Sequence, residues 1–227
     1  MANGFSLVPG GSGANYTGML TRSIVFTGAL LLFLGTTAMT IASIIIPNWI
    51  SYETVTSEGT ALHWNLGLHR RCSNTNLPPF YTSAPHPFSR SECVEFPRYS
   101  ECRGEDRYFC SMWRSVGFLM SFAVVIEGMT IAAFIILLAG GKQRREAGWG
   151  ALTVLVLVGS VVQAISMALM TYLFDTDDQF FPGWYLDKSW SMCTASWVIQ
   201  GLCALAIAVA AVVLPSEGGY ELIPDSA

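Results

Sequence analysis

Four cysteines lie in one segment of this chain, with three histidines in the same stretch: Cys72, Cys93, Cys102 and Cys110, and His63, His69 and His86. Cysteine and histidine are the usual ligands of structural zinc, but there is no C-x-x-C pair, and the cysteine spacings of 21, 9 and 8 match no structural zinc module. An even number of cysteines is more typical of a disulfide framework, which requires an oxidising compartment. We therefore expect this segment to face the lumen or the cell exterior, with zinc as the alternative.

One acidic residue, Glu127, lies in the middle of a long apolar run, "VVIEGMT". An acid at such a position is costly in a membrane and usually faces the interior of a helix bundle or a water path. It would serve as an ion or proton relay, pair with a cation of another subunit, or remain a protonated carboxyl hydrogen-bonded to Gln163 or Gln200. We favour the last interpretation, because those two amides are the strongest polar groups at comparable depth.

A second short segment, "DTDDQFFPGWYLDKSW", mixes acids with aromatic residues. Asp175, Asp177 and Asp178 offer oxygen ligands for Ca²⁺, but neither the spacing nor the glycine of an EF-hand follows them. The aromatic residues are more typical of a membrane-interface belt; they are Phe180, Phe181, Trp184, Tyr185 and Trp190.

The elements that carry these residues are indicated by hydropathy. Of 227 residues, 52% are hydrophobic and 12% are charged, and four segments hold Glu127 as their single charge: 23–52, 115–141, 147–174 and 189–216. Each is long enough for a membrane-spanning helix, and none has the polar face of a soluble helix. The net charge of -4 gives no indication of nucleic-acid binding.

Positive charge sets the expected orientation. Lys142, Arg144 and Arg145 lie between the second and third spans and should remain in the cytosol, together with both termini. The predicted order is a flexible tail 1–22, a span 23–46, an extracellular loop 47–115, a span 116–139, a cytosolic loop 140–148, a span 149–173, a second extracellular loop 174–191, a span 192–214 and a tail 215–227.

The first extracellular loop contains three strand-like runs: "WISYETVT", "ALHWNLGLHRRC" and "SECVEFPRYSEC". In the second run, apolar residues alternate with polar ones, so an extended chain would place Leu62, Trp64, Leu66 and Leu68 on one face. We expect that face to pack on the outer helix ends and the opposite face to meet solvent or a partner. The predicted fold is an all-α membrane protein: a four-helix transmembrane bundle with a small disulfide-linked antiparallel β-sheet in the first extracellular loop.

This plan resembles that of the claudin superfamily, which includes claudins, peripheral myelin protein and the gamma subunits of calcium channels. The family motif is a tryptophan after span one, then G-L-W-x-x-C and a second cysteine; its counterparts here are Trp49, Gly67, Leu68 and Cys72, with Arg114 at a basic position before span two. His69 stands where the motif has tryptophan, Cys102 and Cys110 are additional, and "IPDSA" lacks the terminal Tyr-Val of junctional claudins.

The resemblance implies the disulfides and the partner surface. Cys72 matches the first motif cysteine, and the position of Cys93 relative to Arg114 is nearer the family spacing than that of Cys102, which implies the pairs Cys72–Cys93 and Cys102–Cys110. Cys193 and Cys203, in the fourth span, would be free buried thiols. The resemblance also implies partner contacts in the second loop, at Trp184 and Tyr185, and strand alternation adds His69 and Arg71 on the open face of the sheet.

Three functions remain open from the sequence. The first is a noncatalytic protein that organises membrane contacts, cell–cell adhesion or a barrier at the plasma membrane through its outer sheet. The second is an auxiliary subunit of a channel, receptor or membrane enzyme. The third, a lipid-modifying enzyme, is the weakest, because neither G-x-S-x-G nor H-E-x-x-H occurs. The expected partners are the lipid bilayer and other membrane proteins in cis or trans, including the chain itself, with no cofactor and no metal.

Overall fold

The computed structural model describes residues 22–55, 57, 61–76, 90–98, 102–103 and 107–213. The predicted tails, apart from Arg22, lie outside these residues, as does the middle of the first loop with His86. The expectations for those segments therefore stay predictions.

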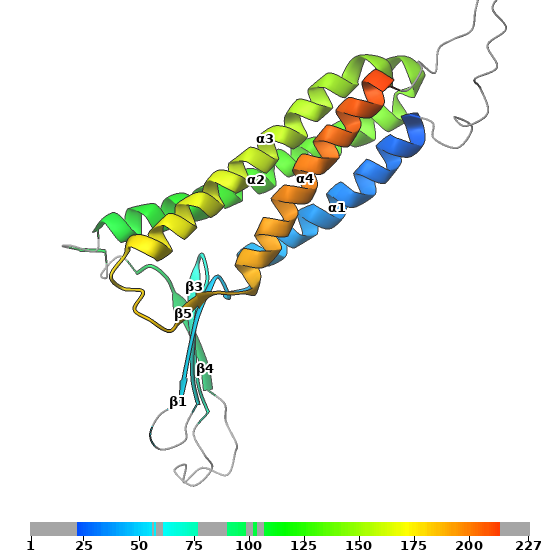
Figure 1. Ribbon diagram of the computed structural model, residues 1–227. Coiled ribbons are helices and arrows are strands. Elements are labelled where there is room, and N and C mark those ends of the chain that lie inside the picture. The colour runs from blue at the N-terminus through cyan, green and yellow to red at the C-terminus, as the bar shows by residue number, and fades with distance from the viewer. Residues whose placement is uncertain are drawn as a thin grey trace, which may run out of the picture.

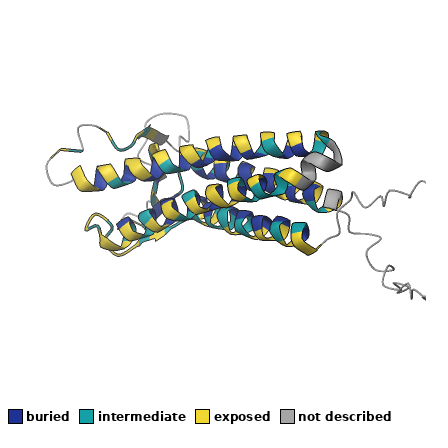
Figure 2. Ribbon diagram, turned by 90° about the horizontal axis from the view of Figure 1, so that it is seen from above, coloured by how far each residue is buried: buried dark blue, intermediate teal, exposed yellow. Residues whose placement is uncertain are grey.

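Four long helices form one bundle: α1 (Arg22–Ile45), α2 (Arg107–Ala139), α3 (Gly141–Thr176) and α4 (Lys188–Val213). α1 packs against α2 and α4, and α3 packs against the same two helices, so each helix has two neighbours (Figure 1). Buried residues line the faces that meet inside the bundle, and exposed residues cover the outside (Figure 2).

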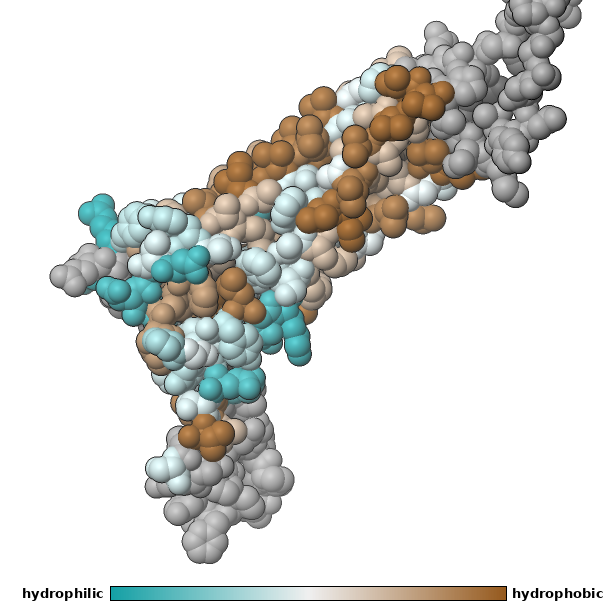
Figure 3. Space-filling model, viewed as in Figure 1, coloured by the Kyte–Doolittle hydropathy of each residue, from teal (hydrophilic) through white to brown (hydrophobic). Residues whose placement is uncertain are grey.

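The outside of this bundle is apolar, which is the reverse of a soluble protein. Exposed residues include Leu31, Phe118, Ile135, Leu202 and Val212. Each helix contains a stretch with a mean hydropathy between 2.0 and 2.5, long enough to cross a bilayer. Figure 3 shows this hydrophobic surface spread along the bundle, with hydrophilic groups gathered at the end nearest the sheet. The chain is an integral membrane protein.

The helices extend beyond the predicted spans. α2 begins at Arg107, so Cys110 and Arg114, which we had expected in the outer loop, lie on a helix that continues into the membrane. The predicted cytosolic loop 140–148 is helical from Gly141 onward, and only Gly140 separates α2 from α3. The limits of the predicted spans were placed where charged residues begin. A charged residue does not end a helix, because backbone hydrogen bonding continues outside the bilayer.

A five-stranded antiparallel sheet projects from one end of the bundle (Figure 1). Its strands are β1 (Ile50–Val55), β2 (Ala61–Leu66), β3 (Arg70–Asn76), β4 (Arg90–Glu95) and β5 (Trp184–Leu186), in the order β4-β3-β2-β1-β5. The sheet predicted in the first loop is confirmed. Its fifth strand comes from the second loop and was not predicted.

The run "ALHWNLGLHRRC" is a hairpin and not a single strand. β2 and β3 pair with each other, Leu66 opposite Arg71, and the Gly67 amide donates a hydrogen bond to the Arg70 carbonyl at 2.8 Å. Leu66 and Leu68 are buried as expected, although Leu68 lies in the turn. The prediction was wrong for Trp64, which is 41% exposed, and for Leu62, because neither belongs to the core that Leu66 and Leu68 share with the helix ends.

The base of the sheet and the helix ends next to it share one hydrophobic core. Trp49 is completely buried there, and its indole N–H donates a hydrogen bond to the Ser43 carbonyl at 2.7 Å. Trp113 donates a second indole hydrogen bond, to the Leu68 carbonyl at 3.2 Å. Because these tryptophans each connect a helix to the chain around the sheet, they fix the sheet on the bundle.

Gly67 is the position in this junction where a larger residue does not fit. A Cβ atom there would lie 2.5 Å from the Cα of Pro47, a backbone atom that cannot turn aside. We expect Gly67→Ala to lower the free energy of unfolding by about 1–3 kcal/mol, measured by thermal unfolding in detergent. Gly28→Ala is the matched control, since nothing lies within 4 Å of its Cβ position. Equal stability of the two variants would contradict the prediction.

Candidate functional site

The four cysteines of residues 72–110 are joined as two disulfides, Cys72–Cys93 and Cys102–Cys110. Both predicted pairs are confirmed, and the zinc alternative is wrong for these cysteines. Cys193 and Cys203 are free and buried, also as predicted. Within the described residues no group of three or more His, Cys, Asp or Glu side chains is placed to hold a metal ion, and Asp177 accepts a hydrogen bond from the backbone amide of Gln179.

Glu127 lies at the centre of a polar cluster to which all four helices contribute. Its Oε1 accepts hydrogen bonds from Thr40 of α1 at 2.9 Å, from Gln163 of α3 at 2.6 Å and from Gln200 of α4 at 2.5 Å. All four side chains have no exposed surface. The predicted contact of Glu127 with Gln163 or Gln200 is confirmed, and both amides take part.

Two members of this cluster were missed by the sequence analysis. The hydroxyls of Thr40 and Ser196 lie 2.8 Å apart, and Ser196 also donates to the Thr36 carbonyl at 3.0 Å. Threonine and serine are common in membrane helices and usually bond to their own backbone, so the sequence gave no specific signal. Glu127 Oε2 has no hydrogen-bond partner within the described residues. The cluster ties the four helices together through hydrogen bonds in the bundle interior.

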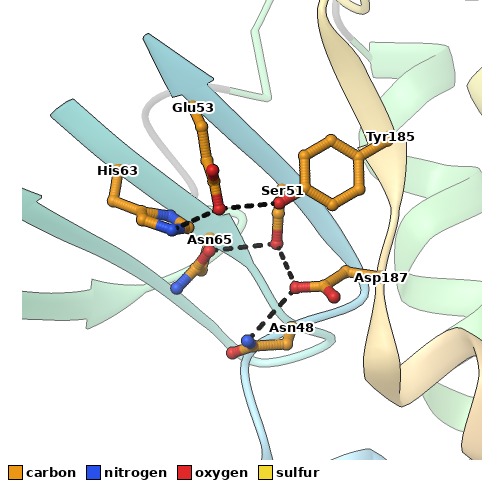
Figure 4. Close-up of polar contacts among 7 residues, drawn as sticks. All are labelled: Asn48, Ser51, Glu53, His63, Asn65, Tyr185 and Asp187. Atoms are coloured by element: carbon orange, nitrogen blue, oxygen red, sulfur yellow. Dashed lines mark hydrogen bonds and ion pairs between the residues drawn. The ribbon is translucent and has the colours of Figure 1, made fainter. Parts of the chain in front are cut away.

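A second polar cluster covers one face of the outer sheet, where β1, β2 and β5 lie side by side (Figure 4). Glu53 Oε1 is its centre: it accepts a hydrogen bond from the Tyr185 hydroxyl at 2.9 Å and lies 2.5 Å from His63 Nε2. Ser51 is buried nearer the bundle, and its hydroxyl lies 2.7 Å from Asp187 Oδ2 and 3.0 Å from Asn65 Oδ1. We call Ser51, Glu53, His63, Asn65, Tyr185 and Asp187 the polar face.

The polar face contains the residue types of a hydrolase without their arrangement. In a nucleophilic triad, histidine accepts the proton of serine and is oriented by an acid. Here His63 contacts Glu53, whereas the Ser51 hydroxyl is bonded within a separate group around Asp187. These residues therefore form hydrogen bonds and an ion-pair contact with one another but no serine–histidine pair.

The pKa of Tyr185 is raised from 10.0 to about 12 by partial burial, by the hydrogen bond to Glu53 and by the negative charges of Glu53 and Asp187. The raised value means that folding favours the neutral phenol. The corresponding contribution to stability is complete below pH 10 and is lost as the pH rises toward 12. Tyr185 is therefore a hydrogen-bond donor at every physiological pH.

We expect this shift to be visible in an ultraviolet tyrosinate titration. The difference between the wild-type curve and that of Tyr185→Phe should be one phenol that ionises near pH 12. Glu53→Gln should move the late step toward lower pH, because it removes the negative charge nearest the phenol. A Tyr185 step near pH 10 in the wild-type protein would contradict the geometry.

The four residues predicted as a partner surface do not share one face. Tyr185 belongs to the polar face, but Arg71 lies on the opposite face with its guanidinium 5.7 Å from the centre of the Phe96 ring. Trp184 also lies opposite, among Tyr52, Phe181 and Trp64. His69 is exposed in the turn after β2, close to Gly117 of α2. Alternation along each strand separates Arg71 from Cys72 and Trp184 from Tyr185.

The motif residues, by contrast, lie together at the junction of sheet and bundle. Trp49 and Leu68 are buried in the shared core, Gly67 forms the tight turn, and Cys72 joins β3 to β4. Arg114 lies on the exposed side of α2, with Nη2 3.7 Å from the sulfur of Cys102. Trp49, Gly67, Leu68 and Cys72 therefore have a structural role at this junction, whereas Arg114 contacts Cys102, which lies outside the strands of the sheet.

The fold and the site define a class: an integral membrane protein with four spanning helices, a polar cluster inside the bundle and a disulfide-bonded sheet outside it. Comparison with known proteins adds no family to this class, because no protein-family model and no curated protein matches the chain.

Proposed function

We propose that this chain is a noncatalytic membrane-organising protein whose sheet makes contacts with a membrane protein in the opposed membrane, in the first instance a second copy of itself. The observation that carries the proposal is the projection of the sheet from the end of the bundle (Figure 1). The base of the sheet packs against the helices. Away from this base, Val55 is 70% exposed and Trp64 is 41% exposed. A sheet that was only a cap would keep such side chains against the helices.

The proposed contact surface is the polar face. Glu53 and Tyr185 are exposed there, and both are held by hydrogen bonds, so a partner meets an ordered surface. Ordered aromatic and charged side chains cost little entropy on binding and are frequent at interface hot spots. The resemblance to the claudin superfamily supports the same function. The proposal requires the disulfide-bonded sheet to lie outside the cell and both termini in the cytosol, as the charge distribution predicts.

Contact formation can be tested in mixed cultures of expressing and non-expressing cells. We expect the wild-type protein to accumulate at borders between two expressing cells and not at borders with a non-expressing cell. The variant Glu53→Gln/His63→Ala/Tyr185→Phe should reach the surface in similar amount and lose this accumulation. Thr54→Ala is the matched control, because Thr54 lies on β1 but on the opposite face of the sheet.

Two outcomes would overturn the proposal. An even distribution of the wild-type protein over the surface would exclude a contact in the opposed membrane between copies of this chain. Co-purification in fixed ratio with a larger membrane protein, unchanged in the triple variant, would favour the auxiliary-subunit function and place the interface on the helices.

A further inference from the structure

A pocket of about 740 Å³ lies beside the outer end of α2, on the side of the Cys102–Cys110 disulfide. Three of the residues that line it are arginines: Arg103, Arg107 and Arg114. Arg107 and Arg114 are two turns apart on α2 and therefore lie on one face of the helix. No acidic side chain is among the described residues that line the pocket; Glu105 and Asp106 lie outside the described residues.

The arginines on α2 keep donors available for a ligand. Arg107 and Arg114 are both exposed, and the hydrogen bond of Arg114 is to the sulfur of Cys102 at 3.7 Å. A disulfide sulfur is a weak acceptor, whereas a guanidinium has five N–H donors in a fork that matches a phosphate or sulfate group. The Ser111 and Ser115 side chains also line the pocket.

The wall of the pocket farther along α2, toward the middle of the membrane, is apolar. Phe118 lies one turn below Arg114, is 69% exposed and stacks with Phe122, whose ring centre is 6.3 Å away. α2 has 33 residues and is about 50 Å long, whereas a hydrocarbon core is about 30 Å thick. Its first turns therefore stand in the headgroup region, and the exposed phenylalanines mark the beginning of the acyl chains.

We propose that this pocket binds an anionic lipid of the outer leaflet, with its phosphate or sulfate on Arg107 and Arg114 and an acyl chain along Phe118 and Phe122. Neither half of the site is sufficient for the assignment: basic side chains bind any anion, and an exposed phenylalanine contacts any lipid. Their placement one helical turn apart, on opposite sides of the membrane boundary, matches a molecule that joins a charged head to a chain. This inference does not depend on the proposed function; it shares with that proposal only the orientation predicted from the charge distribution, with the sheet outside the cell.

Native mass spectrometry of the purified protein in detergent, with added phosphatidylglycerol or phosphatidylcholine of the same chain length, tests the proposal. We expect one phosphatidylglycerol to be retained in preference to phosphatidylcholine. Arg107→Gln/Arg114→Gln should lower the affinity for phosphatidylglycerol about 25-fold, or about fivefold for each arginine, and leave phosphatidylcholine unaffected. Phe118→Ala should weaken both lipids.

Arg70→Gln is the matched control, because Arg70 is also exposed near the outer helix ends but does not line this pocket. It should bind phosphatidylglycerol like the wild type. Glycerol phosphate, which has the headgroup charge without the chains, should compete poorly. Equal retention of the two lipids, an equal loss in Arg70→Gln, or full displacement by glycerol phosphate would each overturn the proposal, the last because the site would then bind an anion and not a lipid.

Discussion

Trp49→Ala is expected to lower the free energy of unfolding by about 3–5 kcal/mol, the largest effect that we predict for a single substitution. Trp49 has no exposed surface, and it packs in the core shared by the sheet and the outer helix ends. Truncation would leave a cavity there and remove the hydrogen bond to the Ser43 carbonyl. Chemical unfolding in detergent measures the stability, and surface labelling measures the amount of folded protein that reaches the membrane.

Trp64→Ala is the matched control for this prediction, since it removes the same side chain from the same domain. Trp64 is 41% exposed, and its closest ring neighbour given by the structure is Trp184, with centroids 6.4 Å apart. Its truncation should cost only about 1 kcal/mol. Equal losses at both positions would mean that the outer part of the sheet is covered in the folded protein.

Glu127→Leu is expected to lower the free energy of unfolding by about 2–4 kcal/mol, because three donors lose their acceptor at about 1 kcal/mol or more each. Leucine is larger than glutamate, so no cavity contributes to the loss. Those donors, Thr40, Gln163 and Gln200, come from the other three helices. The protein should therefore become less stable as a whole in detergent unfolding experiments.

Glu127→Gln separates the role of the carbonyl oxygen from that of charge. Glutamine keeps an acceptor at the position of Oε1, and its amide nitrogen replaces Oε2, which has no partner within the described residues. We expect this variant to lose about 1 kcal/mol or less. If Glu127→Gln were as unstable as Glu127→Leu, the cluster would require a negative charge, and the uncharged carboxyl would be excluded.

The four helices and the interior position of Glu127 could be predicted because the bilayer constrains sequence directly. A spanning helix needs about 20 apolar residues, and an acid within it must face the interior of the bundle. Gln163 and Gln200 must also find hydrogen-bond partners inside the apolar bundle, and the sequence offers few candidates besides each other and Glu127. The disulfide pairs followed from the family resemblance, since four cysteines alone allow three connectivities.

Strand alternation determined which side chains share a face, but not how far that face is covered. Leu66 and Trp64 lie on the same side of β2, yet only Leu66 meets the helices, because the direction in which the sheet leaves the bundle is set by Trp49 and Trp113. The hairpin turn at Gly67 was hidden for a similar reason: the glycine is required by the closeness of Pro47, which belongs to another part of the chain.

The tertiary structure alone decided which residues of other strands join His63 on the polar face. Glu53, His63 and Tyr185 come from β1, β2 and β5, and β5 lies more than a hundred residues along the chain from the other two. β5 has only three residues, too short a run to predict a strand from sequence, and it becomes a strand because the edge of β1 offers hydrogen-bond partners. Sequence periodicity describes each segment separately, whereas a site formed by several segments depends on how their packing brings them together.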